Sequence, residues 1–473
     1  MYSVIFLVFA SFALSLILTP QVRNLALRFG LVDRPDEHRK THKLPIPRVG
    51  GIAVITATVS AYALLLIVRL SAGHIVRSGA PFAVRLLPAV LVIFAVGLAD
   101  DIFDLRPWYK LSAQILAAIL AWQAGIRLYS IDSHPFTVTT SFFITVVWIV
   151  ACSNAVNLID GVDGLATGIG LFATITTLIA GLLHQNIELV FATAPLAGAL
   201  LGFLRYNFNP ASIFLGDCGS LTLGFLLGCY GLVWCEKSST LLSMTAPLLA
   251  LSIPLLDAAL AVARRFLTKK PIFGADRSHI HHKLLSRGLT PRRVVLVLYG
   301  CCALAAAASL MLTAIHQKYQ GFVIVLVSLV ALLGLQHLGY REFSIAGKLA
   351  FDGSFRRLLN AELVLIGFEQ ELSSAATLQQ SWEVLCRVSP QFGFTGSELK
   401  LDGVVCRGEA GSSWRVRIEF PGHGYINLNR TPGVTDRGAT AVLFIDRTSR
   451  LVSNKLKSLE SELVELPVYA NAD

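Results

Sequence analysis

The apolar residues of this chain gather in long unbroken runs rather than in the short periodic patterns of soluble helices and strands. About 20 residues at about 1.5 Å rise per residue cover the hydrocarbon core of a membrane. The pattern therefore predicts an all-α polytopic membrane protein with about 11 transmembrane helices. The predicted spans are 2–19, 49–68, 81–99, 111–126, 139–156, 164–183, 187–205, 213–234, 241–263, 294–313 and 320–338.

Composition supports this class of protein. Of the 473 residues, 54% are hydrophobic and 15% are charged, and the mean hydropathy is +0.64, values that soluble domains do not have. The first run has no cationic segment before it and no obvious small-residue cleavage site, so we expect a retained first helix rather than a cleaved signal.

Charge predicts the orientation of the spans. With the N-terminus outside, the inner loops would carry 19 Lys and Arg residues and the outer loops six. Such an imbalance favours this topology, because cytoplasmic loops carry the excess of cations. The net charge is +10, and the excess lies in membrane loops, where it would meet anionic lipid headgroups and nucleotide phosphates. Nucleic-acid binding is not expected, because the charge is split among loops rather than laid along one element.

The chain changes character near residue 345, where charges begin to appear every few residues. We predict a membrane-embedded domain over 1–340 and a soluble cytoplasmic α+β domain over 345–473. Helices are expected near 355–388, strands at 397–406, 414–420 and 441–446, and a helical leucine stripe at Leu451, Leu456, Leu459 and Leu463, as core rather than interface. The order resembles a GAF-type sensory module without its diagnostic motifs, and a docking or oligomerisation domain is an equal alternative.

Polar segments interrupt the apolar runs, all on the predicted cytoplasmic side. A charge at mid-bilayer costs roughly 2.5 to 3.5 kcal/mol, so clustered carboxylates favour a wet cleft at the inner interface. The structural alternative is that these acids are solvated loop charges and that Asp217 is a helix N-cap. The five main carboxylates are Asp100, Asp101, Asp160, Asp163 and Asp217.

The segment 154–164 indicates the chemistry. On a helix, Asn157, Asp160 and Asp163 follow the spacing i, i+3, i+6 and share one face. Such oxygen ligands suit Mg²⁺, or Mn²⁺ in its place, together with substrate phosphates. The loop 264–293 adds donors that neutralise phosphate oxygens, namely Arg277, His279, His281, His282 and Lys283.

Two alternative chemistries are weaker, and one acid stands apart. Zinc at the histidines would lack thiolate partners, and an ATPase is disfavoured because the chain has no GxxxxGK[ST] motif. Asp257 lies inside an apolar run, seven residues before Arg264. An ion pair between these two residues and a role in the site are equally consistent with that spacing.

Residues 1 to about 340 resemble the polyprenyl-phosphate N-acetylhexosamine-1-phosphate transferases, relatives of the phospho-MurNAc-pentapeptide translocase. The His279-Ile-His281-His282 form and the Arg39-Lys40-Thr-His42 form are similar to the branch that uses UDP-N-acetylaminosugars, whereas the translocase branch has three consecutive histidines. The markers are Asp33-Arg34-Pro35, Arg39 to His42, Pro47 to Gly51, Gly97 to Asp101, Asn154 to Gly164, Asn207 to Ser220 and Asp276 to His282.

The resemblance implies transfer of N-acetylhexosamine 1-phosphate from a UDP-N-acetylaminosugar to undecaprenyl phosphate, with release of UMP. Asp217 would be the principal Mg²⁺ ligand with Asn157 close to the metal. Asp100 would be the base toward the lipid phosphate, with Asp101 alongside it. Asp160, grouped with the catalytic residues, would position nucleotide and diphosphate. The substrate-binding residues would be Lys40, Arg48, Asn154, Asp163, Asn207, Arg277, His279, His281 and His282.

The same resemblance implies a protein of the bacterial inner membrane, with its active site and C-terminal domain cytoplasmic. The product would initiate a surface polysaccharide such as O-antigen, capsule or a teichoic-acid-type polymer. Dimers are common in this family, so a homodimer is a further expectation, while the aminosugar stays open. We favour a single in-line displacement over a covalent intermediate, because a deprotonated polyprenyl phosphate is already a nucleophile. A non-catalytic scaffold or lipid transporter that retains the fold is the alternative from another class.

Overall fold

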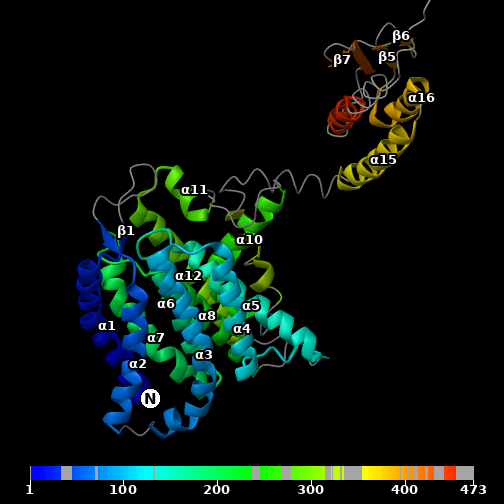
Figure 1. Ribbon diagram of the computed structural model, residues 1–473. Helices are drawn as coiled ribbons and strands as arrows, with labels where there is room; N and C mark the ends of the chain where they lie inside the picture. Colours follow the sequence, from blue (N-terminus) through cyan, green and yellow to red (C-terminus); the bar gives the residue numbers. More distant parts are fainter. Residues whose placement is uncertain are drawn as a thin grey trace, which may run out of the picture. The chain divides into compact units, whose positions relative to one another are not determined.

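Most of the predicted apolar runs form helices in the computed structural model of the chain (Figure 1). The chain forms two compact units, Met1–Gly339 and Tyr340–Asp473. The structure describes residues 2–33, 45–69, 73–131, 134–236, 245–267, 279–314, 321, 323–326, 328–330, 333–334, 354–375, 377–394, 396–401, 404–407, 414–420, 424–430 and 441–453.

Eight helices of the described residues are long and apolar enough to cross a membrane. In the first unit these long helices run side by side as a bundle (Figure 1). The protein is therefore a multi-pass membrane protein. The eight are α1 (Tyr2–Phe29), α2 (Gly50–Ile67), α3 (Gly73–Phe103), α5 (Val138–Ile159), α6 (Leu165–Leu183), α7 (Ile187–Asn207), α8 (Gly216–Glu236) and α12 (Pro291–Ala314).

Three of the eleven predicted spans are not among the eight. The run at 111–126 forms α4 (Pro107–Ala124), a helix of 18 residues. The run at 241–263 forms two helices, α9 (Thr245–Ala250) and α10 (Ser252–Leu267), which meet at a turn at Leu251. The run at 320–338 lies largely outside the described residues. The predicted count of 11 is thus not reproduced by the part of the chain that the structure describes.

Short elements connect the helices of this unit. Two short antiparallel strand pairs lie among these connections. Strand β1 (Val32–Asp33) pairs with β2 (Ile46–Pro47), and β3 (Ser130–Ile131) pairs with β4 (His134–Pro135). A short helix, α11 (Ile280–Ser286), precedes α12. These connections place the polar segments at the ends of the long helices.

Helices α1 and α7 approach closely because α7 presents glycine toward its neighbour. A Cβ on Gly198 would lie 2.1 Å from the carbonyl oxygen of Val8 and 2.2 Å from Oγ of Ser11. Tyr206, at the end of α7, donates from its hydroxyl to the carbonyl of Leu16 at 3.1 Å. Lipid tails are as apolar as the side chains of the helices, so membrane helices associate largely through close packing. Small residues at the interface let the helix backbones come into direct contact.

The second unit combines helices with a four-stranded antiparallel sheet, in the strand order β6-β5-β8-β7. Its core gathers aromatic side chains, and Phe444 stacks on Phe392 with ring centroids 4.7 Å apart. The elements are α15 (Ser354–Ser374), α16 (Leu378–Val388), η2 (Ser389–Phe392), β5 (Gly396–Leu401), β6 (Val404–Arg407), β7 (Trp414–Phe420), β8 (Gly424–Arg430) and a helix over 441–453.

The prediction of a strand at 441–446 is wrong, because these residues begin the helix 441–453. The buried residues Ala441, Phe444 and Thr448 follow helical spacing, whereas a short apolar run fits either period. The predicted strand 397–406 is two strands, with Asp402-Gly403 between them in the sequence, a pair typical of tight hairpins. Of the leucine stripe, Leu451 packs on the core, while Leu456, Leu459 and Leu463 lie outside the described residues.

Candidate active site

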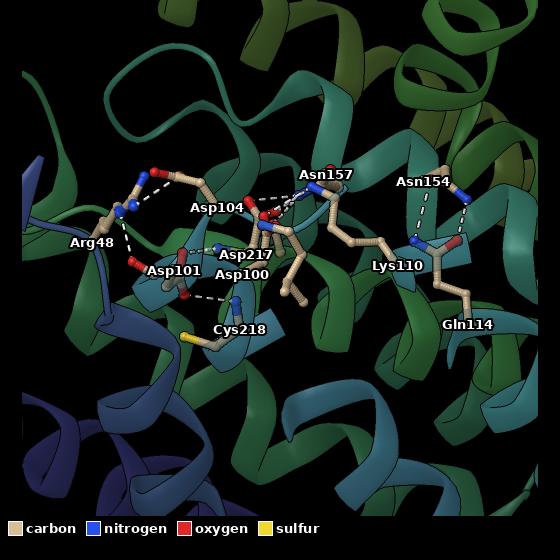
Figure 2. A network of polar contacts seen from close by, with 12 residues as sticks. Arg48, Asp100, Asp101, Asp104, Lys110, Gln114, Asn154, Asn157, Asp217 and Cys218 are labelled. Carbon is tan, nitrogen blue, oxygen red and sulfur yellow. Dashed lines mark hydrogen bonds and ion pairs between the residues drawn. The ribbon is translucent and has the colours of Figure 1, made fainter. Parts of the chain in front are cut away.

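Four helix ends meet around the predicted acids. The C-terminal ends of α3 and α5 lie beside the N-terminal ends of α4 and α8, and these helices pack on one another in pairs. Figure 2 shows their polar side chains converging on Asp217, with Asp101 and Arg48 to one side and Lys110 to the other. The chain thus brings residues more than one hundred positions apart into one network.

Asp101 anchors the start of α8. Its two carboxylate oxygens accept hydrogen bonds from the backbone N–H groups of Asp217 at 2.8 Å and Cys218 at 2.9 Å. Its residue exposure is only 5%. A helix N-terminus leaves several N–H groups without intrahelical partners and carries partial positive charge, so a carboxylate there is doubly favourable. Asp101 therefore fixes where Asp217 begins its helix.

Glycines allow the backbones of this region to touch. A Cβ on Gly97 of α3 would lie 2.5 Å from the carbonyl oxygen of Asp217. Gly216 has φ +76, a conformation that favours glycine, and a Cβ there would lie 1.9 Å from the carbonyl oxygen of Arg48. The backbone N–H of Gly51 donates to the carbonyl of Leu215 at 2.8 Å. The position of Asp217 is thus set by direct backbone packing.

Lys110 joins the two carboxylates that the sequence placed at the reaction centre. Its Nζ lies 2.9 Å from Oδ2 of Asp100 and 2.8 Å from Oδ2 of Asp217. The other oxygen of Asp100 accepts the backbone N–H of Leu105 at 2.7 Å. One ammonium group therefore holds Asp100 and Asp217 together, as Figure 2 shows.

Asn157 approaches Asp217 from the last turn of α5. Its Nδ2 donates to Oδ1 of Asp217 at 3.0 Å and to Oγ of Ser220 at 2.9 Å. The amide oxygen makes no hydrogen bond with the described residues. Asn157 thus combines a contact to Asp217 with an oxygen left for a further ligand.

Asp160 follows the last residue of α5, as its C-cap. Burial, and then the carboxylates of Asp217, Asp101 and Asp163, raise the pKa of Asp160 well above its usual range. Within the described part of the chain its side chain has no hydrogen bond or cation partner. A carboxylate placed among other carboxylates favours the arrival of a positive charge.

Asp163 and Asn207 support the loops around the site. Oδ2 of Asp163 accepts from Nδ2 of Asn209 and from the backbone N–H of Ala211, both at 3.0 Å. Asn207 accepts from the hydroxyl of Thr167 at 2.7 Å and donates to the carbonyl of Ile213 at 2.9 Å. Asn207 is 2% exposed, so its amide is occupied by the protein on both sides.

Asn154 and Arg48 lie at opposite sides of the network in Figure 2. Asn154 pairs its side-chain amide with that of Gln114 on α4 and donates to the carbonyl of Val150. Arg48 donates from Nε to the carbonyl of Asp101 at 2.8 Å and from Nη2 to Oδ1 of Asp104 at 3.0 Å. Lys40 and Arg277, the other predicted phosphate contacts, lie outside the described residues.

The histidine segment reaches the end of α5 from α11. A Cβ on Gly161 would lie 2.9 Å from Nε2 of His281, so that ring packs directly on the loop between Asp160 and Asp163. The His281 ring stacks on His279 at 5.7 Å between centroids, and His282 lies 4.3 Å from it. Burial, and then His282, lower the pKa of His281 to about 4. His281 is therefore a neutral ring at physiological pH.

The oxygen atoms around Asp217 resemble the ligands that Mg²⁺ prefers. No group of three or more His, Cys, Asp or Glu side chains in the described parts of the chain is arranged to hold a metal ion by itself. Mg²⁺ is commonly bound by one or two carboxylates, with waters and substrate phosphates completing its shell. Asp217, the side-chain amide oxygen of Asn157 and the carboxylate of Asp160 fit that requirement, and the last two have no hydrogen-bond partner among the residues that the structure describes.

Sequence reasoning missed Lys110 as a member of the site and left the role of Asp257 open. Lys110 was considered only as one of the cations of the predicted inner loops. It lies ten residues after Asp100 on the same predicted side of the membrane, and this position could have indicated its contact with the acids. Asp257 was considered with Arg264, whereas the structure places its carboxylate on His279. Pairing across helices is not visible in the spacing of one helix, which explains why neither the contacts of Lys110 nor the partner of Asp257 was predicted.

The helices that form this site lie in a part of the chain that is similar to known proteins. Residues 83–234, which run from α3 through α8, match the family model of Glycosyl transferase family 4. The chain is 35% identical to a probable undecaprenyl-phosphate N-acetylglucosaminyl 1-phosphate transferase of Bacillus subtilis over 293 residues, covering 60% of this chain and 78% of that protein.

Two further relatives show the same extent of likeness. A decaprenyl-phosphate N-acetylglucosaminephosphotransferase of Mycobacterium tuberculosis is 34% identical over 62% of this chain and 79% of its own length. An undecaprenyl-phosphate alpha-N-acetylglucosaminyl 1-phosphate transferase of Thermotoga maritima is 29% identical over 60% and 83%.

The fold and the helix-end site define a multi-pass membrane enzyme of the phosphotransferase class. More particularly, the chain belongs to glycosyl transferase family 4, the polyprenyl-phosphate N-acetylhexosamine-1-phosphate transferases. The family expected from the sequence motifs is thereby confirmed.

Proposed function

We propose that this protein transfers N-acetylhexosamine 1-phosphate from a UDP-sugar to undecaprenyl phosphate. The products are undecaprenyl-diphosphate-sugar and UMP. The named activities of the relatives support a polyprenyl phosphate acceptor and an N-acetylglucosamine-type donor. The reaction would take place at the inner face of the bacterial plasma membrane, in line with the cation excess of the predicted inner loops.

One observation carries the proposal. Lys110 binds both Asp100 and Asp217, and Asn157 binds Asp217 from a third direction. A cluster of carboxylates, one ammonium and one amide at converging helix ends can hold phosphate groups through a divalent ion while a neighbouring carboxylate accepts a proton. Asp160 lies among other acids and has no cation partner within the described residues. A network with a purely structural role would not need such an acid.

Mg²⁺, or Mn²⁺ in its place, is the proposed cofactor. Asp217 and the amide oxygen of Asn157 would hold it, with Asp160 nearby. When bound, the ion neutralises diphosphate oxygens and stabilises the charge that develops during transfer. The raised pKa of Asp160 fits a carboxylate whose charged form awaits a cation.

The protein's own residues would do the remaining work. Asp100 would accept the proton of the lipid phosphate, and Lys110 would keep that carboxylate aimed at the reaction centre. Asp101 would hold the N-terminal turn of α8 so that Asp217 stays in place. Because a polyprenyl phosphate is a nucleophile once deprotonated, positioning and charge neutralisation suffice for one in-line displacement.

The substrate side of the site would lie along the loop 160–163 and the histidine segment. Asp163 would shape the pocket through its bonds to Asn209 and Ala211. His279, His281 and His282 would contact phosphate or sugar, joined by Lys40, Arg48 and Arg277. Asn154 and Asn207 would act through the helices they brace, since their amides are engaged by protein partners.

The product would initiate a surface or cell-wall polymer. The identity of the aminosugar is tested by a panel of UDP-N-acetylaminosugars against one lipid acceptor. A homodimer, the further expectation from the family, is tested by the mass of the purified protein in nanodiscs.

The deciding experiment measures release of UMP from UDP-N-acetylglucosamine by the full chain in detergent or nanodiscs, with and without undecaprenyl phosphate and Mg²⁺. We expect release to require both. Asp217→Asn should remove turnover, while the exposed Asp446→Asn, which lies in the second unit, should leave it unchanged. Turnover that persists in Asp217→Asn would refute the metal assignment. Binding of lipid phosphate without any UMP release would favour the scaffold or transporter alternative.

A further inference from the structure

A second buried carboxylate lies behind the site. Asp257 of α10 is 2% exposed, and it was not among the residues that the sequence motifs assigned to the reaction. Its Oδ2 lies 3.0 Å from Nδ1 of His279, and its Oδ1 accepts the backbone N–H of Ile280 at 2.8 Å. Both oxygens thus contact the point where α11 begins.

Burying an unpaired carboxylate is costly, so its partners are informative. One oxygen has a neutral backbone donor, and the other faces a ring nitrogen that can carry a proton. The Oδ2 contact requires that proton on Nδ1 of His279, because a carboxylate only accepts. The pair therefore fixes which nitrogen of His279 is always protonated, and it leaves Nε2 for another partner.

This ring is connected to the proposed substrate side. His279 stacks in parallel on His281, and His281 packs against Gly161 between Asp160 and Asp163. A carboxylate behind Nδ1 also stabilises the ring when Nε2 carries a second proton, since the ring is then a cation. A cationic ring donates a charge-assisted hydrogen bond, which is stronger than a neutral one and suits phosphate.

We infer that Asp257 is a positioning residue that acts through His279. It holds the proton on Nδ1 and faces the ring with a negative charge, so that the ring, once Nε2 is also protonated, donates a charged hydrogen bond from Nε2 to a phosphate of the UDP-sugar. This inference rests on the proposed function for the identity of the substrate, while the contact between the two side chains stands by itself. Backing of a ligand-binding histidine by a carboxylate is a general device for fixing its tautomer and orientation.

A structural role is the competing explanation, because Asp257 also accepts the N–H of Ile280. Asp257→Asn separates the two roles. Its amide oxygen can still accept from Ile280, but its NH₂ group must donate to Nδ1 of His279, which moves the ring proton to Nε2 and removes the negative charge. The start of α11 is kept, whereas the charged donor is lost.

The first measurement is steady-state UMP release with UDP-N-acetylglucosamine and undecaprenyl phosphate varied separately. We expect Asp257→Asn to lower kcat/KM about 10- to 100-fold, by analogy with the loss of a partner behind a metal-binding histidine. The KM for the UDP-sugar should rise and the KM for the lipid phosphate should not. Asp446→Asn, an exposed acid-to-amide change, is the matched control.

A double variant tests the route through the ring. In a His279→Gln background, adding Asp257→Asn should cost less than about threefold more, because the group that Asp257 positions is already gone. A full additional loss in that background, equal KM changes for both substrates, or Asp257→Asn activity within about twofold of the wild type would each overturn the inference.

Nitrogen-15 NMR of the histidine rings tests the contact without relying on activity. His279→Gln identifies the resonance, and we expect Nδ1 of His279 to be protonated in the wild type at about pH 7. An unprotonated Nδ1 would overturn the inference even if Asp257→Asn failed to fold. If the wild type released no UMP, the proposed function would fall, and the ring measurement would still decide whether Asp257 sets the proton on His279.

Discussion

The side chain of Asp101 holds the backbone N–H of Asp217 at 2.8 Å, across 116 positions of sequence. Its second oxygen holds the next N–H, that of Cys218. The neighbouring acid, Asp100, instead meets Lys110. Two adjacent aspartates thus have different surroundings, one facing backbone amides and the other facing an ammonium group and the site.

Replacing Asp101 with Ala should destabilise the protein and displace Asp217. Two buried N–H groups would lose their acceptor, and each unsatisfied group costs about 1 to 3 kcal/mol. We expect a lower Tm together with loss of UMP release, and a smaller loss of both for Asp101→Asn, which keeps one acceptor oxygen. A normal Tm and normal turnover in Asp101→Ala would contradict the capping role; Asp446→Ala controls for removal of an acid.

Lys110→Met should lower turnover by about two orders of magnitude, a typical cost for losing a preorganised charge at a reaction centre. The change leaves Asp100 and Asp217 close together without the ammonium group that binds both. Lys110→Arg keeps the charge with different geometry and should retain part of the activity. Lys400→Met, at an exposed position of the second unit, serves as the control, and equal activity in Lys110→Met and Lys400→Met would argue against this role.

Gly97→Val should disrupt the contact between α3 and α8. The added Cβ would meet the carbonyl oxygen of Asp217 at 2.5 Å, so the helices must separate, at a cost of about 1 to 3 kcal/mol for overpacking. Thermal unfolding and UMP release should both decline. Gly300→Val makes the same change on α12, where no heavy atom lies within 4 Å of the added Cβ, and it should be tolerated. Similar Tm values for the two variants would show that α3 and α8 can adjust.

Stability should fall as the pH is lowered from about 6.5 to about 4 because of His281. Burial lowers the pKa of this ring to about 4 in the folded protein from its ordinary value of 6.5. In that window the unfolded chain binds a proton that the folded chain resists, so the free energy of unfolding decreases, by about 2 kcal/mol at about pH 5. Above about pH 6.5 this contribution is fully present and does not vary.

Thermal unfolding at about pH 7.5 and about pH 5 checks this effect. His281→Asn should show a smaller drop in Tm between the two pH values than the wild type. His184→Gln, at an exposed position, should show the wild-type drop. An identical drop in wild type and His281→Asn would mean that another group controls the acid response.

The long apolar runs predicted the helices well, because a membrane span needs little beyond length and hydropathy. The break at Leu251 was not predicted, since α9 and α10 form one continuous apolar run in sequence. The helix at 441–453 was mistaken for a strand because six mostly apolar residues fit both periods until the buried positions are known.

The site was predictable in part. Motifs brought together Asp100, Asp217 and Asn157, which the structure joins directly or through Lys110. They did not separate the tasks of Asp100 and Asp101, because adjacent residues on one helix end look alike until their partners on α4 and α8 are known. For the same reason, the bond between Asp257 and His279 depends on tertiary contact that spacing along the chain does not record.

The bond from Asp101 to the start of α8 has a consequence for biosynthesis. Asp100, Asp101 and Lys110 lie on α3 and at the start of α4 and are made together, whereas Asn157 and Asp217 lie in stretches that are translated later. The backbone amides that Asp101 binds are translated more than one hundred residues after it. The nascent chain therefore carries Asp101 without its amide partners until α8 is made, and the contacts around Asp217 form only after α3, α4 and α5 are present.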